Sequence, residues 1–525
     1  MQTTKKEDTK KGKGKRKTNQ LPQKKKASPQ VSESLDQFKQ QFSEELVQEL
    51  KEKQVLATVG EAFVTNLQDL YFKNSEFPKI TNLAALAEEK VRHSVYKLLF
   101  HRHIYVKVEP NLENMSELWA SFLSLFDLIL SGDQQVLKDL DLPNEWVWDI
   151  MDEFLYQFHT FQLFKSRSAI KGGEEDLQKV KELDPKVWNL LTVLNYLDQF
   201  VSKSGITETL SRPNKDGESV LNASGFNHLM QLFGYFSVVG LLRVNCLIGD
   251  YRLAAKISEP ILNLGRAKNR SILTEITPIC HIETYYYLSF CYLMMRKYND
   301  CIRSLQYILT YIERTKQYIQ SRSYQYQQLS KKTEQLYCVL TIAISLCPQP
   351  IEYILYSQVL SKNGEIVEKI REGEISGFEN LFHSSAPKFI SPSPSDWSSK
   401  EDPHHIAYNL QKDVFLADVE QQLPLPKISS YLKLYSNIEV SKLAKFSSLN
   451  EEDLTQLLLC IKHKTRKMIG TEKMRGESSG VDFFIIKDMI HVDNNKKFEG
   501  TKKIYIEDFI TQSGKLQRIR RNLAK

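Results

Sequence analysis

The stretch LAKFSSLNEEDLTQLLLCIKHK, residues 443–464, predicts two helices joined by a tight turn, and VDFFIIKDMIHV, residues 481–492, predicts strands soon after it. Two short helices followed by strands are the outline of a winged helix-turn-helix. In the second helix, apolar residues recur at the i, i+3, i+4 and i+7 spacing of one buried face, namely Leu454, Leu457, Leu458 and Ile461. The sequence therefore predicts an amphipathic helix inside a winged-helix module.

The start of this second helix indicates which kind of partner the module binds. Asn450 is the expected N-cap, Asp453 falls at the third helical position, and Leu449 and Leu454 flank the cap as a hydrophobic staple. The three residues that follow Asn450 are all carboxylates. In a DNA-reading helix these residues would face the bases, where a polyanion repels them. The module is therefore predicted to bind protein and not DNA.

The positive charge of the chain is concentrated at its N-terminus. The 525 residues carry a net charge of +7, but residues 1–26 contain eleven Lys or Arg against two acids, so the rest is nearly neutral at about −2. Because residues 1–30 have few apolar side chains, they are predicted to form a disordered basic arm. Such an arm attracts RNA phosphates without specific geometry, or serves as a nuclear-import signal or a solubilising tail. Its candidate RNA contacts are Lys13, Lys15, Arg16 and Lys17.

The cysteines and the apolar runs indicate the compartment of the protein and whether it enters a membrane. The seven cysteines are odd in number, form no C-x-x-C pair and lie mostly in apolar helical runs. They are predicted to be buried reduced thiols of a cytosolic or nuclear protein. No signal peptide is expected, and uncharged runs such as LFGYFSVVGLL have eleven residues, fewer than a bilayer requires. We therefore expect no membrane insertion.

Motifs for catalysis are missing from the sequence. It contains no G-x-x-x-x-G-K-[ST], H-E-x-x-H or G-x-S-x-G, and the H-x-E at His281 lacks the P-C-x-x-C that a zinc deaminase needs. Asp149, Asp152 and Glu153 share one helix and could seat an acid/base pair, but complementing the helix dipole is the favoured interpretation. The chain is predicted to be no enzyme and to hold no metal or cofactor.

Helical patterns dominate from residue 32 to about residue 380. In LPNEWVWDIMDEFLYQFHTFQLF a single face carries Trp146, Ile150, Phe154 and Phe158, enough aromatic area to anchor a core. Segments 171–176 and 203–225 are polar and contain glycine, so they are predicted to be loops. Residues 31–220 are assigned to an N-terminal helical domain.

Two similar units lie in residues 229–312. GLLRVNCLIGDYRLAAKI and YLSFCYLMMRKYNDCIRSL align with an offset of 47, which matches Tyr251 with Tyr298 and Ala254 with Cys301. Each unit has a long apolar helix, a short turn and a second helix, the pattern of stacked helical hairpins. Residues 221–386 are therefore predicted to form a TPR-like solenoid, a class of fold that usually binds proteins.

The C-terminal third continues with further segments. Residues 387–403 contain four prolines and five serines and are predicted to be a loop. Helices and the winged helix fill residues 404–495, with a break at Pro424 and Pro426. Both faces of VDFFII are apolar, so this strand should be buried on both sides or paired with a partner. Residues 496–525 predict a last amphipathic helix that docks on its own domain or on a partner bundle.

One helical segment combines basic and aromatic residues. Residues 296–332 hold eight Lys or Arg, two acids and six tyrosines, as in proteins that bind single-stranded RNA. Arg303 and Arg314 align along the helix, whereas Lys316 points elsewhere. Tyr307 and Tyr311 share a face with neighbouring isoleucines, which suits burial at least as well as exposure. Arg303 and Arg314 are candidate RNA contacts, and a solvated charged face is the alternative.

Six segments in chain order carry a family resemblance: YKLLFHRHIYVKV, LPNEWVWDIMDEFLYQF, GYFSVVGLLRVNCLIGDY, TYYYLSFCYLMMRKYNDCIRSLQYILTYIERTK, APKFISP and YLKLYSNIEVSKLAKF. Over about residues 90–495 they are similar to the subunit L family of eukaryotic translation initiation factor 3. The resemblance implies helical repeats ending in a PCI domain, whose winged helix is an assembly device. The Lys-rich arm departs from the acidic, Tyr-rich start associated with that family, so RNA contact by the arm rests on charge alone.

The resemblance also implies a function. It implies a non-catalytic, cytoplasmic subunit of a multi-protein factor that binds the small ribosomal subunit and supports recruitment of initiator tRNA and mRNA. Its implied neighbours are other PCI subunits, K and E first. A direct RNA-binding protein and a PCI scaffold of another complex, such as the proteasome-lid type, are the alternatives.

We expect two groups of residues to join partner subunits through apolar burial. Those of the winged-helix module and its contacts are Leu443, Leu449, Leu454, Leu458, Phe483 and Ile485. Those of the terminal helix, expected to dock in a bundle, are Phe509, Leu516, Ile519 and Leu523.

Overall fold

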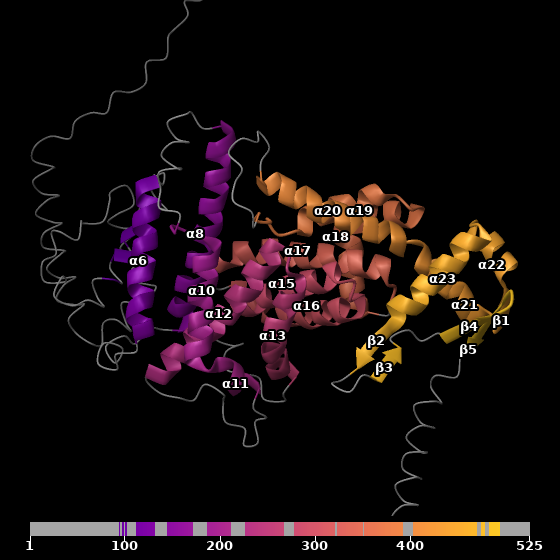
Figure 1. The fold of residues 1–525 in the computed structure, drawn as a ribbon, viewed down its shortest axis with the longest axis horizontal. Helices are drawn as coiled ribbons and strands as arrows, with labels where there is room; N and C mark the ends of the chain where they lie inside the picture. Colours follow the sequence, from indigo (N-terminus) through magenta and orange to yellow (C-terminus); the bar gives the residue numbers. More distant parts are fainter. Residues whose placement is uncertain are drawn as a thin grey trace, which may run out of the picture. The chain divides into compact units, whose positions relative to one another are not determined.

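A computed structural model describes residues 94, 97, 98, 100, 101, 112–131, 144–171, 186–211, 226–266, 278–320, 323–349, 351–391, 403–469, 474–477 and 482–493. The chain divides into two compact units, Met1–Glu109 and Pro110–Lys525. The fold below is that of the second unit (Figure 1). The predicted basic arm and the predicted terminal helix lie outside the described residues.

Among the described residues, the first part of this unit contains four helices: α6 (Leu112–Ser131), α8 (Asn144–Lys171), α10 (Leu190–Ser204) and the short α11 (Ile206–Ser211). Phe154 of α8 is fully buried, and its ring centroid lies 5.0 to 6.0 Å from those of Trp119, Phe122, Phe126 and Trp188. Aromatic pairs at these separations stabilise beyond their buried area.

This aromatic core confirms the predicted packing face. Ile150 and Phe158 are buried with Phe154 on the same side of α8, as the four-residue spacing indicates. The side chain of Trp146 lies outside the described residues. The prediction of a continuous loop over residues 203–225 is wrong, because α11 begins at Ile206, whose side chain is fully buried.

The turn before α10 ties this core together. The indole Nε1 of Trp188 donates to the carbonyl oxygen of Met115 at 3.0 Å, and the carbonyl oxygen of Trp188 accepts from Gln162 Nε2 at 2.8 Å. Asn189 then caps α10 by accepting the backbone N–H of Leu191 at 3.1 Å. The buried indole is therefore satisfied, and α6, α8 and α10 are joined at one point.

Stacked helical hairpins follow. Their helices are α12 (Phe226–Ile248), α13 (Tyr251–Arg266), α15 (Pro278–Met294), α16 (Tyr298–Gln320), α17 (Ser323–Leu346), α18 (Tyr353–Glu372) and α19 (Ile375–Ser385). Helices α12, α15 and α17 pack on one another in sequence, while α13, α16 and α18 each pack on the helix before them. This alternation is the TPR-like arrangement that the sequence predicts.

The predicted repeat recurs in the backbone of the turns. Gly249 has a φ of +99°, and Arg296, 47 positions later, has a φ of +61°. In both turns the N–H of the next residue bonds at 2.9 Å to the carbonyl oxygen five positions before it. This is the Schellman motif that ends a helix. The matched residues Ala254 and Cys301 are both fully buried, so the offset of 47 is confirmed.

Helix α12 is the first helix of this stack and also packs on α8 and α10. Within the described residues it is the one helix long and apolar enough to cross a membrane, over Leu229–Ile248, and 83% of that window is buried against other helices. The helix is longer than the apolar run that marked it in the sequence, yet its burial is that of a core helix. A Cβ at Gly234 would lie 2.0 Å from Ser204 Oγ, so glycine permits the close approach of α10.

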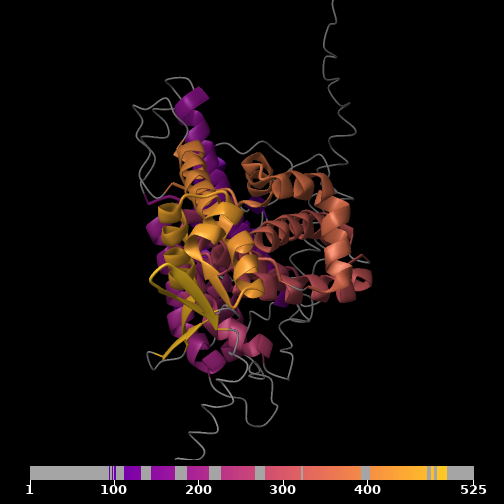
Figure 2. The same cartoon turned by 90° about the vertical axis from the view of Figure 1, so that its right-hand side faces the viewer.

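The start of the Pro/Ser-rich segment is part of the core. Phe389 and Ile390 are buried, and the N–H of Ile390 bonds to the carbonyl oxygen of Leu247 at 2.9 Å. Helix α20 (Pro403–Gln422) follows and lies beside α8, as Figure 2 shows in orange and purple. It ends before α21 (Pro424–Leu434), which confirms the predicted proline break.

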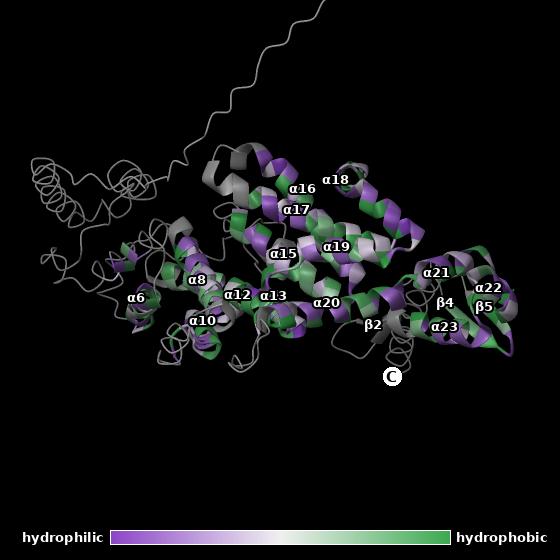
Figure 3. Ribbon diagram, turned by 90° about the horizontal axis from the view of Figure 1, so that it is seen from above, coloured by the Kyte–Doolittle hydropathy of each residue, from purple (hydrophilic) through white to green (hydrophobic). Residues whose placement is uncertain are grey.

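The winged helix completes the described fold with α22 (Val440–Ser447), α23 (Glu451–Thr465) and five strands: β1 (Asn437–Glu439), β2 (Arg466–Ile469), β3 (Met474–Glu477), β4 (Asp482–Ile486) and β5 (Met489–Asp493). One antiparallel sheet has the order β1-β5-β4, and β2 pairs with β3. The strands β4 and β5 are those that the sequence predicts, whereas β1, β2 and β3 were not predicted. Hydrophobic and hydrophilic segments alternate along α23 and α18 (Figure 3).

Replacing Phe154 by Ala should lower the free energy of unfolding by about 4 kcal/mol, because the change empties the centre of a close-packed aromatic core. Urea unfolding followed by tryptophan fluorescence measures this loss. The matched control is Tyr156→Ala on the same helix, whose side chain is 53% exposed, with an expected change within about 0.5 kcal/mol. Equal losses for the two variants would contradict the proposed core.

Candidate functional site

The core of the winged-helix module contains most of the residues predicted for it. Leu443, Leu454 and Leu458 are fully buried and Phe483 is 4% exposed. Leu449 and Ile485 pack against this core and remain partly exposed. Four of the six predicted side chains thus hold α22, α23 and the sheet together. A partner would therefore contact other, exposed residues of these helices and strands.

The N-terminus of α23 is acidic and exposed. Glu451, Glu452 and Asp453 lie in its first turn with exposed side chains, where carboxylates favour the positive end of the helix dipole. Asn450 accepts the N–H of Leu454 through its backbone carbonyl oxygen at 3.0 Å, and its side-chain amide donates to Asp453 at 3.2 Å. Three carboxylates at this end disfavour a nucleic-acid backbone.

The β1-β5-β4 sheet has an apolar, exposed face on the side away from the module core. Phe484 and Ile486 of β4 are 51% and 54% exposed, and Met489, which pairs with Ile486 on β5, is 38% exposed. The prediction that VDFFII is buried on both sides is therefore wrong within this chain, because only Phe483 and Ile485 face the core. We name Phe484, Ile486 and Met489 the wing face.

Two features make the wing face suitable for contact. The ring of Phe484 stacks on His491 of β5 with centroids 5.2 Å apart, so it is held in place before any partner arrives. Among the strands that the structure describes, β4 is also an edge of its sheet, since the order is β1-β5-β4; the carbonyl oxygen of Phe483 already accepts a hydrogen bond from Lys462 Nζ. An edge strand presents unpaired backbone groups that another strand can pair with.

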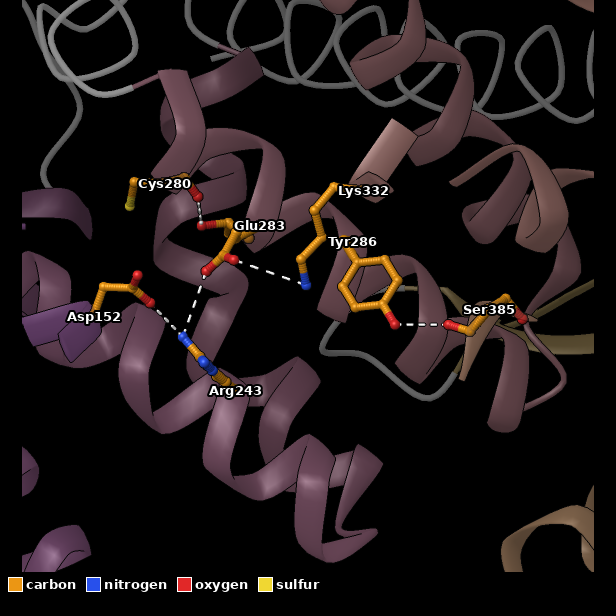
Figure 4. A network of polar contacts seen from close by, with 8 residues as sticks. Asp152, Arg243, Cys280, Glu283, Tyr286, Lys332 and Ser385 are labelled. Atoms are coloured by element: carbon orange, nitrogen blue, oxygen red, sulfur yellow. Dashed lines mark hydrogen bonds and ion pairs between the residues drawn. The ribbon is translucent and has the colours of Figure 1, made fainter. Parts of the chain in front are cut away.

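A chain of four alternating charges crosses the helical stack (Figure 4). Arg243 of α12 lies 2.5 Å from Asp152 of α8 and 3.6 Å from Glu283 of α15. The other carboxylate oxygen of Glu283 lies 3.7 Å from Lys332 of α17. We name these residues the charge network. It joins four helices that are distant in sequence.

Aromatic rings surround the two cations of the network. Lys332 Nζ lies 4.2 Å from the ring centroid of Tyr286 and 5.0 Å from that of Tyr287, and Arg243 lies 5.9 Å from the ring of Tyr287. The hydroxyl of Tyr286 donates to the backbone carbonyl oxygen of Ser385 at 2.6 Å, which links the network to α19.

Burial changes the acidity of these groups in opposing directions. Burial raises the pKa of Glu283, while Lys332 and Arg243 oppose that rise. Burial by itself would lower the pKa of Arg243, but Tyr287, Asp152 and Glu283 raise it. The guanidinium therefore stays charged, and the network is a structural ion-pair cluster.

The H-x-E sequence belongs to this region and has no catalytic geometry. His281 is 4% exposed, and burial lowers its pKa to about 4, so its imidazole is neutral at pH 7. Burial also raises the pKa of the Cys280 thiol, which makes it a poor nucleophile. Across the described part of the chain, no group of three His, Cys, Asp or Glu could hold a metal ion.

The other residues that the sequence predicts for a site lie in different parts of the chain. Arg303 and Arg314 are both exposed on α16, as is Lys316 on another side of the helix. Asp152 belongs to the charge network, and Glu153 accepts a hydrogen bond from Gln157, so this carboxylate cluster is structural. Lys13, Lys15, Arg16, Lys17, Phe509, Leu516, Ile519 and Leu523 lie outside the described residues.

The described fold is that of a helical-repeat protein ending in a winged helix, a class that assembles with other proteins. A family model described as "RNA polymerase I-associated factor PAF67" matches residues 114–516. Eukaryotic translation initiation factor 3 subunit L of Nematostella vectensis is 39% identical over 478 residues, which cover 89% of each chain. The Homo sapiens and Xenopus tropicalis proteins of that name are each 38% identical over 473 residues, or 88% of this chain and 82% of theirs. The chain belongs to the family of eukaryotic translation initiation factor 3 subunit L.

Replacing Arg243 by Met should cost about 3 kcal/mol of unfolding free energy, because Asp152 and Glu283 would lose their shared cation. The double variant with Glu283→Gln should be less destabilised than the two single losses added together, since each single variant already loses the Arg243–Glu283 interaction. Urea unfolding of the four proteins in this cycle measures the coupling. Strict additivity would show that the network does not act as a unit.

Stability should also depend on His281 between pH 7 and pH 5. The unfolded state takes up a proton near pH 6.5 and the folded state only near pH 4, so acidification favours unfolding. By linkage, the loss at pH 5 is about 2 kcal/mol. The comparison is with His281→Phe, which should lose less stability over the same pH range because every other titrating group, including the buried His101, is common to both proteins. Identical losses in the two proteins would contradict the buried neutral imidazole.

Proposed function

We propose that the chain is a non-catalytic scaffold subunit of a eukaryotic initiation factor 3 complex in the cytoplasm. Its winged helix and its terminal helix join other PCI subunits, with K and E the first candidates. Through that complex it supports recruitment of the small ribosomal subunit and mRNA. Membership of the subunit L family supports the assignment to an initiation factor 3 complex. The helical stack with its winged helix supports the scaffold role.

The observation that carries this proposal is the wing face. A sheet with one solvated side normally alternates apolar and polar residues, with the polar ones outside. Here Phe484 and Ile486 are about half exposed although the module already has a complete apolar core. Apolar side chains gathered on an edge strand are typical of an interface and expose the free protein to aggregation. A partner that covers these side chains would remove them from water and would protect the edge strand from aggregation.

The predicted terminal helix supplies a second attachment in this proposal. Phe509, Leu516, Ile519 and Leu523 recur on one apolar side of the sequence, so burial against a helical bundle of sister subunits would stabilise them. The core residues Leu443, Leu454 and Leu458 serve the same attachment indirectly, because they fix the position of the sheet.

The family disfavours one alternative and leaves another open. A scaffold of a proteasome-lid-type complex would share a PCI fold, but the relatives are named as subunits of initiation factor 3. A direct RNA-binding role is compatible with a scaffold, because its candidate residues lie on α16 and on the basic arm, away from the wing face in the sequence.

The test is co-purification of the tagged chain with initiation-factor subunits after nuclease treatment. The double variant Phe484→Asp with Ile486→Asp should reduce recovery of at least one PCI subunit by about tenfold or more, since buried carboxylates have no partner there. Leu516→Asp with Ile519→Asp should release the subunit in the same assay while the repeats stay folded.

The matched control is Leu191→Asp on α10, an isolated apolar side chain that is 72% exposed. It makes the same chemical change outside the proposed interface, so recovery should match the unmodified chain. Circular dichroism should give the same helix content for all variants. If the wing and terminal-helix variants recover every subunit as the control does, the scaffold proposal is wrong.

A further inference from the structure

We infer that the outer face of α16 binds single-stranded RNA through the ring of Tyr307 and the guanidinium groups of Arg303 and Arg314. This inference goes beyond the scaffold role and concerns different residues. The three positions fall on one stripe of the helix, because steps of four and seven residues return to nearly the same angle at 3.6 residues per turn. All three side chains are exposed, with Tyr307 at 40%.

The ring of Tyr307 is supported from below. Its centroid lies 5.0 Å from that of Tyr285 and 5.9 Å from that of His281, both of which are buried in α15. The adjacent residue Ile308 is fully buried and anchors the same turn of α16. A ring fixed on one side and open on the other can stack with a base at little loss of side-chain freedom.

The two arginines have their charge available for a ligand. Neither guanidinium makes an ion pair with a residue that the structure describes. Two acids lie on this helix: Asp300, three residues before Arg303 and on the same side, and Glu313, which accepts a hydrogen bond from Gln358 of α18 at 2.9 Å. With two arginines and one aspartate, the stripe keeps a net positive charge, and Arg303 and Arg314 lie on either side of Tyr307.

The spacing suits a short run of nucleotides. Eleven residues of α-helix separate Arg303 from Arg314 by roughly 16 Å, with Tyr307 between them. A cation, a stacking ring and a second cation in line are the elements of sequence-independent binding to single strands. Lys256 is exposed on α13 at the hairpin position that matches Arg303, so the neighbouring hairpin carries a cation at the equivalent position.

A protein partner is the less favoured occupant of this face. An acidic peptide would use Arg303 and Arg314 equally well, but it has no planar group that requires an exposed, pre-positioned tyrosine ring. An apolar helix would require aliphatic side chains along the stripe, whereas Ile308 and Ile312 are buried beneath it. The combination of ring and guanidinium groups therefore favours RNA.

Fluorescence anisotropy of the full chain with a labelled fifteen-residue oligouridylate tests the inference. Lys13, Lys15, Arg16 and Lys17 are replaced by Gln throughout, so that the basic arm does not mask the signal. Tyr307→Ala should weaken binding about tenfold through lost base stacking, and Tyr307→Phe should retain it. Arg303→Gln with Arg314→Gln should weaken binding and reduce the slope of log K against log salt by about 1.4 for two lost phosphate contacts.

The matched control is Lys316→Gln, which removes one exposed charge from another side of the same helix and should change affinity less than twofold. Unchanged thermal unfolding of every variant shows that the face alone has changed. The inference is overturned if Tyr307→Ala and the double arginine variant bind as Lys316→Gln does. It is also overturned if Tyr307→Phe loses as much as Tyr307→Ala, or if polyglutamate competes as well as RNA at equal charge.

Discussion

The fold depends on burying helices that are apolar on nearly every side. In α15, thirteen of seventeen residues are buried, from Pro278 to Leu293, so no single neighbour can cover this helix. Helix α12 has the same character. Such helices are stable only when other helices enclose them, which forces the hairpins to stack and assigns the amphipathic α13 and α16 to the outer layer.

This constraint explains why polar chemistry inside the stack is structural. A charge placed among apolar helices is retained only with an opposite partner, and Arg243 and Lys332 each contact an acid and a tyrosine ring. Ion pairs of this geometry also fix which helix faces meet, because a shifted register would leave a charge unpaired. The H-x-E at His281 thus reflects packing: one residue fills an aromatic cluster and the other completes the charge network.

Local patterns in the sequence predicted the helices, the offset of 47 and the core of α23, because each depends on spacing within one element. The charge network could not be predicted, since Asp152 and Arg243 come from helices 91 residues apart. Strand β1 has only three residues and lies in a segment whose sequence pattern is helical. It forms because β5 pairs with it. The apolar pattern of VDFFII is the same for a doubly buried strand and for an interface, so only the fold distinguishes Phe483 from Phe484.

The same constraint indicates which surfaces can bind a partner and which kind of partner suits each. A side chain in the enclosed layer cannot reach a partner without opening the stack, so recognition belongs to edges and to the outer helices. The wing face is apolar and lies on an edge strand, which suits a partner that brings its own apolar side chains and backbone hydrogen bonds. The stripe on α16 combines guanidinium groups with one anchored ring, which suits a charged and stacking ligand. Because the wing face lies on the sheet that packs on α22 and α23, and Tyr307 lies on the α15–α16 hairpin, each surface rests on its own buried support. Either surface can therefore be altered without the other, so the proposed protein assembly and the proposed RNA contact can be tested separately.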